Sequence, residues 1–229
     1  MLNGNQKRMI VDTMSLNEVG EAILKASQKS MSKIVALLLN KDKAYRRVII
    51  KEYKERYVFQ KISFTTDGIE FNLCPYSEGK KDYKKYGISY FLIAHVFYKG
   101  TNWYCIIANH SQSVELYCNH FFERYVERHL KDDSEINVEL VRKYFMEINK
   151  LTAIRRLEHP KYKDCIYGAT NIGVCCGQMV SNQVMVLKTY IDKETLTLGE
   201  KKLIYDDGQK RLEAFITNEI GIREFEFAA

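Results

Sequence analysis

Three residues that can carry positive charge, His120, Arg124 and Arg128, recur at every fourth position in the segment HFFERYVER. On an α-helix this spacing places the side chains along one ridge, where like charges repel by about 0.2–0.5 kcal/mol per pair. Such a ridge is useful where an anion binds, because arginine presents a planar fork to phosphate oxygens and an unperturbed histidine titrates near neutral pH. The segment therefore predicts that the cationic edge forms one wall of an anion site. The alternative interpretation is a solvated helix face on which Arg124 pairs with Glu127.

The helix that would carry this ridge is amphipathic and is predicted to span about residues 113–130. At about 100° per residue, the apolar side chains collect on one face, and the ridge lies on a flank roughly 120° away. Glu123 and Glu127 occupy the opposite flank. His129 falls on the apolar face and is interpreted as a core histidine with satisfied hydrogen bonds. The buried face comprises Cys118, Phe121, Phe122, Tyr125 and His129.

The periodicity of the rest of the chain predicts an α+β fold, with a predominantly antiparallel sheet arrangement and helices packed against it. Ser15 and Glu18 form a capping box, which indicates the start of a helix. Alternating apolar residues indicate strands, and Asp67-Gly68 indicates a hairpin turn between two of them. The expected helices cover about residues 16–26, 32–40, 113–130 and 136–156, with 46–56 as a further candidate and 192–217 as helix and loop. The expected strands cover residues 58–64, 69–73, 88–98, 102–108, 165–169, 173–180 and 183–191, the first four as a meander.

The composition is typical of a soluble globular protein: the 229 residues are 46% hydrophobic and 28% charged. The chain is interpreted as one compact unit over residues 1–229, with a soft division into 1–110 and 111–229. No apolar signal segment follows the first residues, and the longest aliphatic run, 34–39, is far shorter than the roughly 20 residues that span a bilayer. We therefore expect a cytoplasmic protein without membrane association. The net charge of +6 permits an anionic partner.

The six cysteines are irregularly spaced, and we expect free thiols in a reducing compartment. Cys118 and His120, together with Cys175-Cys176, have the residue types of a zinc site. On the predicted helix, however, Cys118 and His120 point to different faces and cannot readily share a metal ion. His120-x-x-Glu123 lacks a third ligand. No metal and no cofactor is therefore predicted, and no local signature supports a cysteine nucleophile paired with His95, His110 or His159.

The ridge and the last strand together resemble RelE-like and related toxin ribonucleases of the barnase/EndoU/colicin/RelE class. Several of these families carry an H-x3-R-x3-R helix ahead of an antiparallel sheet, and their last strand often ends in a threonine with aromatic or aliphatic neighbours. In this chain the helix residues are His120, Arg124 and Arg128, and the matching strand contains Thr189 and Tyr190.

This resemblance, which covers at most residues 113–192, implies metal-independent cleavage of RNA. The 2′-hydroxyl attacks the adjacent phosphate, a general base takes its proton, and cations stabilise the phosphorane. By this resemblance His120 would act as base or acid and the two ridge arginines would hold the phosphate. Thr189 and Tyr190 would supply hydroxyl groups from the strand.

A lysine- and tyrosine-rich segment, residues 77–87, is expected to form a loop, and the resemblance implies that this loop contacts nucleic acid. Its lysines would bind the phosphate backbone and its aromatic ring would stack on a base, and an ordinary solvated loop is the alternative. The predicted contact residues are Lys80, Lys81, Lys84, Lys85 and Tyr83.

Two functions are carried forward from the sequence. The first is a metal-independent endoribonuclease of toxin type, or a degenerate RNA-binding relative, with RNA or another anion and an antitoxin-like protein as partners. The second is a non-enzymatic accessory protein that uses the cationic helix edge to bind an acidic partner.

Overall fold

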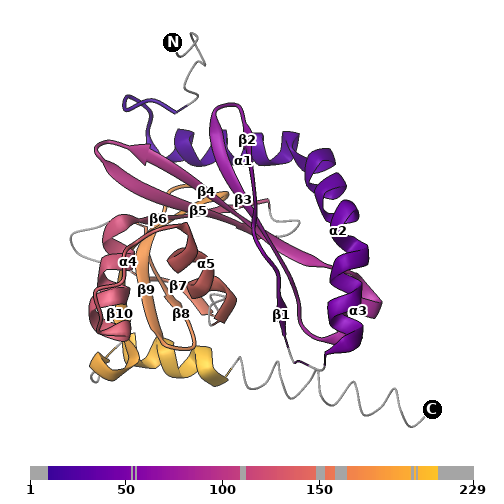
Figure 1. Cartoon of the computed structure of the whole chain (residues 1–229). Coiled ribbons are helices and arrows are strands. Elements are labelled where there is room, and N and C mark those ends of the chain that lie inside the picture. Colours follow the sequence, from indigo (N-terminus) through magenta and orange to yellow (C-terminus); the bar gives the residue numbers. More distant parts are fainter. Residues whose placement is uncertain are drawn as a thin grey trace. The chain divides into compact units, whose positions relative to one another are not determined.

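The computed structural model describes residues 10–52, 54, 56–108, 112–147, 153–157, 164–196, 199 and 201–210. The chain has an α+β fold of helices and mostly antiparallel strands, which confirms the predicted fold class (Figure 1). It divides into two compact units. The first comprises Met1–Asn119, Asn137–Arg142 and Val180–Val186, and the second comprises His120–Ile136, Lys143–Met179 and Leu187–Ala229.

An antiparallel sheet forms the centre of the first unit. Strand β3 pairs with β1, β2 and β4, and the sheet continues through β5 to β6. The predicted hairpin is confirmed: Asp67 and Gly68 have φ angles of 51° and 76°, the left-handed values that a type I′ turn needs at both positions. The predicted meander is present, except that the first strand, expected over 58–64, is divided into two strands, β1 and β2, which both pair with β3. The strands are β1 (Tyr57–Val58), β2 (Ile62–Thr66), β3 (Ile69–Ser77), β4 (Ser89–Tyr98), β5 (Thr101–Ala108) and β6 (Val114–Cys118).

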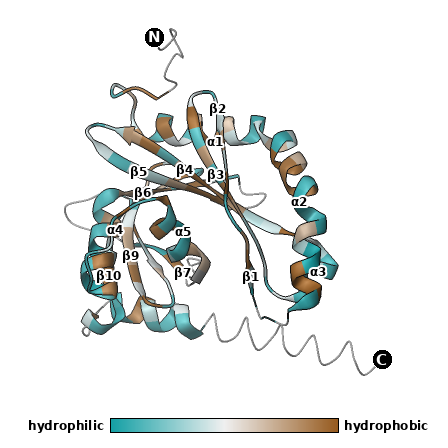
Figure 2. Cartoon of the chain, viewed as in Figure 1, coloured by the Kyte–Doolittle hydropathy of each residue, from teal (hydrophilic) through white to brown (hydrophobic). Residues whose placement is uncertain are grey.

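Helices α1 (Leu16–Lys29) and α2 (Met31–Lys51) belong to the same unit, and α1 packs on β5 and β6. The predicted capping box is present, because the Ser15 hydroxyl accepts from the Glu18 N–H and the Glu18 carboxylate accepts from the Ser15 N–H. Apolar side chains of α1, such as Ile23, share one buried cluster with the sheet. In Figure 2, β3 and β4 are coloured mainly as hydrophobic residues, whereas hydrophobic and hydrophilic residues alternate along α2. Burial of apolar surface is the main term that stabilises such a layer.

Gly20 marks the closest approach of α1 to the sheet. A Cβ atom at this position would lie 2.7 Å from both γ-methyl groups of Val184 and 3.2 Å from a δ-methyl group of Leu116. We expect Gly20→Ala to lower the free energy of unfolding by about 1–2 kcal/mol through overpacking, although alanine is the better helix former. Urea denaturation measures the change, with exposed Lys25→Ala on the same helix as the control, expected within about 0.5 kcal/mol of wild type. A neutral or stabilised Gly20→Ala variant would contradict the close packing.

The second unit contains the predicted ridge, an antiparallel group of strands and a cluster of aromatic rings. The three strands predicted in the last third of the chain are confirmed. Tyr125, Tyr144 and Tyr190 are fully buried, and the ring of Tyr125 meets those of Tyr144 and Tyr190 edge to face at centroid distances of 4.9 and 5.7 Å. Its elements are α4 (Asn119–Tyr125), a π-helix (Val126–Leu130), β7 (Ala153–Leu157), β8 (Cys165–Ala169), β9 (Gly173–Met179), a 3-10 helix (Lys193–Thr195) and helical residues 201–210. It also contains the later parts of α5 (Val138–Glu147) and β10 (Val184–Asp192), which both begin in the first unit.

The predicted start of the ridge helix was wrong. Residues 114–118 form strand β6, and the helix begins only at Asn119. The segment pairs with β5, with Leu116 opposite Cys105 and Tyr117 opposite Tyr104, and Val114, Leu116 and Tyr117 are fully buried. Cys118 is therefore a strand residue, and its predicted place on the apolar face of the helix is corrected.

Three further boundaries differ from the prediction. The helix expected over 136–156 ends at Glu147, and residues 153–157 form β7. The helices expected over 32–40 and 46–56 are one helix, α2, because buried Tyr45 and Ile49 continue its inner face through the basic stretch. Of the segment 192–217, residues 193–195 and 201–210 are helical, and the part after 210 lies outside the described residues.

The expected loop at 77–87 contains a short helix, α3 (Lys80–Tyr86). Gly79 and Gly87 flank it with φ angles of 99° and 75°, values that favour glycine, and the Gly87 N–H donates to the Tyr83 carbonyl at 2.9 Å. With seven residues and four lysines, the segment shows no apolar periodicity from which to predict a helix.

All six cysteines are free thiols, as predicted. Within the described ranges, no helix is both long and apolar enough to cross a membrane.

Candidate functional site

The predicted ridge is present on α4 and the π-helix, but two of its three side chains contact acidic residues of the same helix. His120 Nδ1 lies 3.1 Å from Glu123 Oε2, and Arg124 Nη1 donates to the Glu127 carboxylate. Arg124 Nε is also 3.4 Å from His120 Nε2. The Arg124–Glu127 pair is the one expected for a solvated helix face. Exposed pairs of this kind contribute only about 0.2–1 kcal/mol, so a bound anion could replace the carboxylates with little loss of stability.

Arg128 has a different environment from the other two ridge residues. Its Nη1 donates to the backbone carbonyl of Tyr190 at 2.8 Å, which ties the π-helix to β10. A guanidinium has five N–H donors, so this bond leaves capacity for a second acceptor. Thr189, the neighbouring strand residue, is half-buried.

Tyr190 is fully buried, and its hydroxyl group is engaged inside the unit. The hydroxyl oxygen lies 2.8 Å from the Ile172 carbonyl oxygen and 2.9 Å from Asp192 Oδ2, so its single proton is shared between two acceptors. This position corrects the substrate-facing role predicted for Tyr190. The residue instead positions Asp192.

A histidine–carboxylate pair follows Arg128 directly. His129 Nδ1 lies 2.7 Å from Asp192 Oδ2, and the side chain of Asp192 is 2% exposed whereas that of His129 is 26% exposed. The imidazole stacks on Tyr125 with ring centroids 5.5 Å apart and 18° between the planes, and it meets the Tyr190 ring edge on. These contacts hold the imidazole in one orientation while part of the side chain reaches solvent.

Hydrogen bonds keep Asp192 ionised despite its burial. Burial alone would raise the pKa of its carboxyl group, but donation from the Glu194 backbone, His129 and Tyr190 outweighs it and holds the pKa below the usual 3.8. An ionised carboxylate can only accept, so Nδ1 of a neutral His129 carries the proton and Nε2 is left as the acceptor. Burial, and then the charge of Asp192, raise the pKa of Tyr190, which remains a donor. The pair therefore presents the imidazole tautomer that a general base requires.

The π-helix sets the position of His129. The Lys131 N–H donates to the Val126 carbonyl at 2.8 Å, a bond across five residues, and Lys131 ends the helix with a φ angle of 56°. Turns of this type hold an extra residue and are frequent at functional sites. The sequence predicted a core histidine with satisfied hydrogen bonds, whereas the structure places the ring at the edge of the core, 26% exposed, with Nδ1 bonded to a buried carboxylate.

Asp192 is held at the end of β10 by contacts on both sides. Its Oδ1 accepts from the Glu194 N–H at 2.9 Å, which caps the 3-10 helix. On the neighbouring strand, a Cβ atom at Gly173 would lie 2.2 Å from the Ile191 carbonyl oxygen and 3.0 Å from the Tyr190 ring. Only glycine allows this approach of the backbone, so Gly173 helps to fix the strand that carries the carboxylate.

The predicted nucleic-acid contacts all lie on α3 in the first unit. Lys80, Tyr83 and Lys84 line a pocket with residues of α2, whereas Lys81 and Lys85 do not. The ammonium group of Lys85 instead lies 5.0 Å from the centroid of the Tyr86 ring.

His129 and Asp192 are the candidate functional residues that the sequence did not indicate as a pair, because no motif spacing connects positions 63 residues apart. His110 and His159, weighed as partners of a cysteine nucleophile, lie outside the described residues. In the part of the chain that the structure describes, no group of three or more His, Cys, Asp or Glu side chains could hold a metal ion.

Comparison with known proteins gives no family assignment. The chain has no significant match to a protein-family model, a curated protein or a solved structure.

Proposed function

We propose that the protein is an RNA-directed, metal-independent endoribonuclease of the toxin type, with its catalytic residues on the π-helix of the second unit. The observation that carries this proposal is the His129–Asp192 pair beside Arg128. The buried carboxylate of Asp192 fixes the tautomer of the partly exposed imidazole of His129. The guanidinium of Arg128 lies on the same turn of the π-helix. These are the two groups that attack by a 2′-hydroxyl needs: a base for its proton and a cation for the phosphorane.

In this mechanism, Nε2 of His129 takes the proton of the 2′-hydroxyl as its oxygen attacks the adjacent phosphorus. The bond from phosphorus to the 5′-oxygen breaks, and that oxygen takes a proton from solvent. The products are a 2′,3′-cyclic phosphate and a 5′-hydroxyl end. Arg128 stabilises the negative charge on the phosphorane through its remaining N–H groups, and Arg124 exchanges Glu127 for a phosphate oxygen.

Cleavage of a labelled RNA of mixed sequence in excess chelator tests this proposal. We expect fragments that end in 2′,3′-cyclic phosphate, and no cleavage where a 2′-deoxynucleotide replaces the nucleotide on the 5′ side of the scissile bond, because the attacking group is then missing. Failure of the folded protein to cleave any RNA, or equal cleavage of DNA, would overturn the proposal.

The second candidate function is a non-enzymatic accessory protein that binds an acidic partner. The observation that favours it is the pairing of His120 with Glu123 and of Arg124 with Glu127 on an exposed helix face. Such a face presents both positive and negative side chains to a partner. Its histidine, His120, is paired with the exposed Glu123 and not with a buried carboxylate. A folded protein that leaves RNA intact would favour this function.

A further inference from the structure

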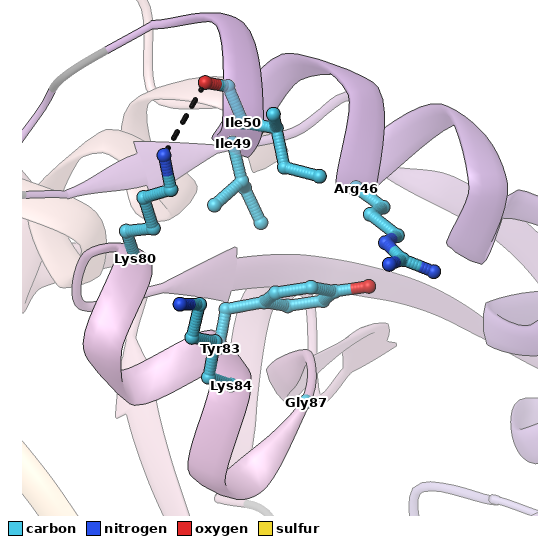
Figure 3. Close-up of a pocket in the computed structure, with 7 residues that line it drawn as sticks. All are labelled: Arg46, Ile49, Ile50, Lys80, Tyr83, Lys84 and Gly87. Atoms are coloured by element: carbon cyan, nitrogen blue, oxygen red, sulfur yellow. Dashed lines mark hydrogen bonds between the residues drawn. The ribbon is translucent and has the colours of Figure 1, made fainter.

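A pocket between α2 and α3 lies wholly within the first unit and takes no part in the proposed cleavage site. Its volume is about 420 Å³, within the range of about 300–1,000 Å³ that is typical of small-molecule sites. Arg46, Ile49 and Ile50 enter it from α2, and Lys80, Tyr83 and Lys84 enter it from α3 (Figure 3).

The polar part of the pocket is cationic. Among the described residues that line it, three are basic and none is acidic. Lys80 Nζ lies 3.5 Å from the Ile50 carbonyl oxygen, near the C-terminal end of α2, where a cation is favoured. Within the described part of the chain, Arg46 and Lys84 form no ion pair. Their charges are therefore available to an anion that enters the pocket.

The remaining wall is apolar and aromatic. Ile49 is fully buried, and Ile50, although at the pocket, keeps 52% of its surface exposed. The Tyr83 ring extends across the pocket with its hydroxyl end toward Arg46 (Figure 3). That hydroxyl donates to Asp42 Oδ1 at 3.0 Å, which holds the ring in place at the edge of the pocket. A fixed ring beside an exposed aliphatic side chain provides a surface on which a flat base can stack.

We propose that this pocket binds one nucleotide, with the base against Tyr83 and Ile50 and the phosphate attracted by the charges of Arg46 and Lys84, which lie toward opposite ends of the Tyr83 ring (Figure 3). Inorganic phosphate would use only the cationic part of the site, and a nucleoside would use only the apolar wall. The nucleotide could be free in solution or could be the 5′-phosphorylated end of an RNA strand, since both present the same chemistry. The proposal does not depend on cleavage by the second unit.

Isothermal titration calorimetry with 5′-AMP, adenosine and inorganic phosphate tests the site. We expect saturable binding of one 5′-AMP, with adenosine and phosphate each at least about tenfold weaker. Arg46→Gln and Lys84→Gln should each weaken 5′-AMP binding at least about tenfold, because each removes a charge-assisted contact. Lys43→Gln is the matched control, since Lys43 is exposed on α2 and does not line the pocket.

A second arm separates the two sources of the nucleotide. A 2′-O-methyl oligonucleotide lacks the attacking hydroxyl and remains intact, and it is tested with and without a 5′-phosphate as a competitor of 5′-AMP. If the oligonucleotide displaces 5′-AMP only when it carries a 5′-phosphate, the site is assigned to an RNA end. If neither oligonucleotide displaces 5′-AMP, the site is assigned to a free nucleotide. The proposal is overturned if 5′-AMP does not bind at millimolar concentration, or if Arg46→Gln and Lys84→Gln both bind it like wild type. Neither result bears on RNA cleavage, which is measured separately.

Discussion

Replacement of His129 by glutamine is expected to lower the rate of RNA cleavage by at least about 100-fold, because a positioned general base contributes about 10²–10⁴-fold. Glutamine can still donate to Asp192 from its amide, so the buried carboxylate keeps a partner. It cannot take a proton at neutral pH, however, and the chemical step loses its base. Initial rates on a labelled RNA in chelator measure the effect, together with a circular dichroism spectrum to show that the fold is kept.

The matched control for this substitution is His95→Gln in strand β4 of the first unit. His95 Nε2 lies 3.1 Å from Asn102 Oδ1, a contact that glutamine can reproduce, so the rate should stay within a few-fold of wild type. The control also tests whether a contaminating nuclease accounts for the activity, since all variants are purified alike.

His120→Gln tests which histidine is the general base: His129, as the geometry of the site indicates, or His120, as the resemblance to toxin ribonucleases implied. His120 is an exposed residue whose Nδ1 faces Glu123 on the same exposed helix face. We expect its loss to reduce cleavage less than the loss of His129. The reverse order of effects would return the role of general base to His120 and would contradict the assignment to His129.

The features of the fold that could be predicted are those encoded within a few residues. The Ser15–Glu18 capping box and the Asp67-Gly68 turn depend on contacts between near neighbours, and both are present. The alternation of the strands is also local, which is why the meander was predicted correctly. Helix α3 was missed because its short, lysine-rich sequence shows no apolar face.

The candidate site could be predicted only in part, because its central contact is not local. The ridge spacing led to the segment that also carries His129, but not to the π-helix that follows Tyr125 or to the strand that precedes Asn119. The pairing of His129 with Asp192 depends on where β10 ends relative to the helix. An ideal helical wheel places His129 in the core and gives no information on its partner.

Asp192→Asn is expected to lower the free energy of unfolding by about 2–3 kcal/mol at pH 7, the range of a buried hydrogen bond to a charged group. The wild-type carboxylate accepts from His129, Tyr190 and the Glu194 backbone. Asparagine has the same shape but can accept on one oxygen only, so its amide group must face at least one donor. Asp206→Asn is the matched control, because the Asp206 side chain is 44% exposed and its pair with Lys202 is of the weak, exposed kind.

The effect of Asp192→Asn should depend on pH in a defined direction. The pKa of Asp192 is lower in the folded protein than its usual 3.8, so the carboxylate stabilises the fold above that value, and the contribution is lost as the pH falls through the folded pKa. The difference between wild type and Asp192→Asn should therefore narrow as the pH falls below 3.8. Urea denaturation at a series of pH values measures it. A difference that persists unchanged in acid would contradict the assignment of this stabilisation to the ionised carboxylate.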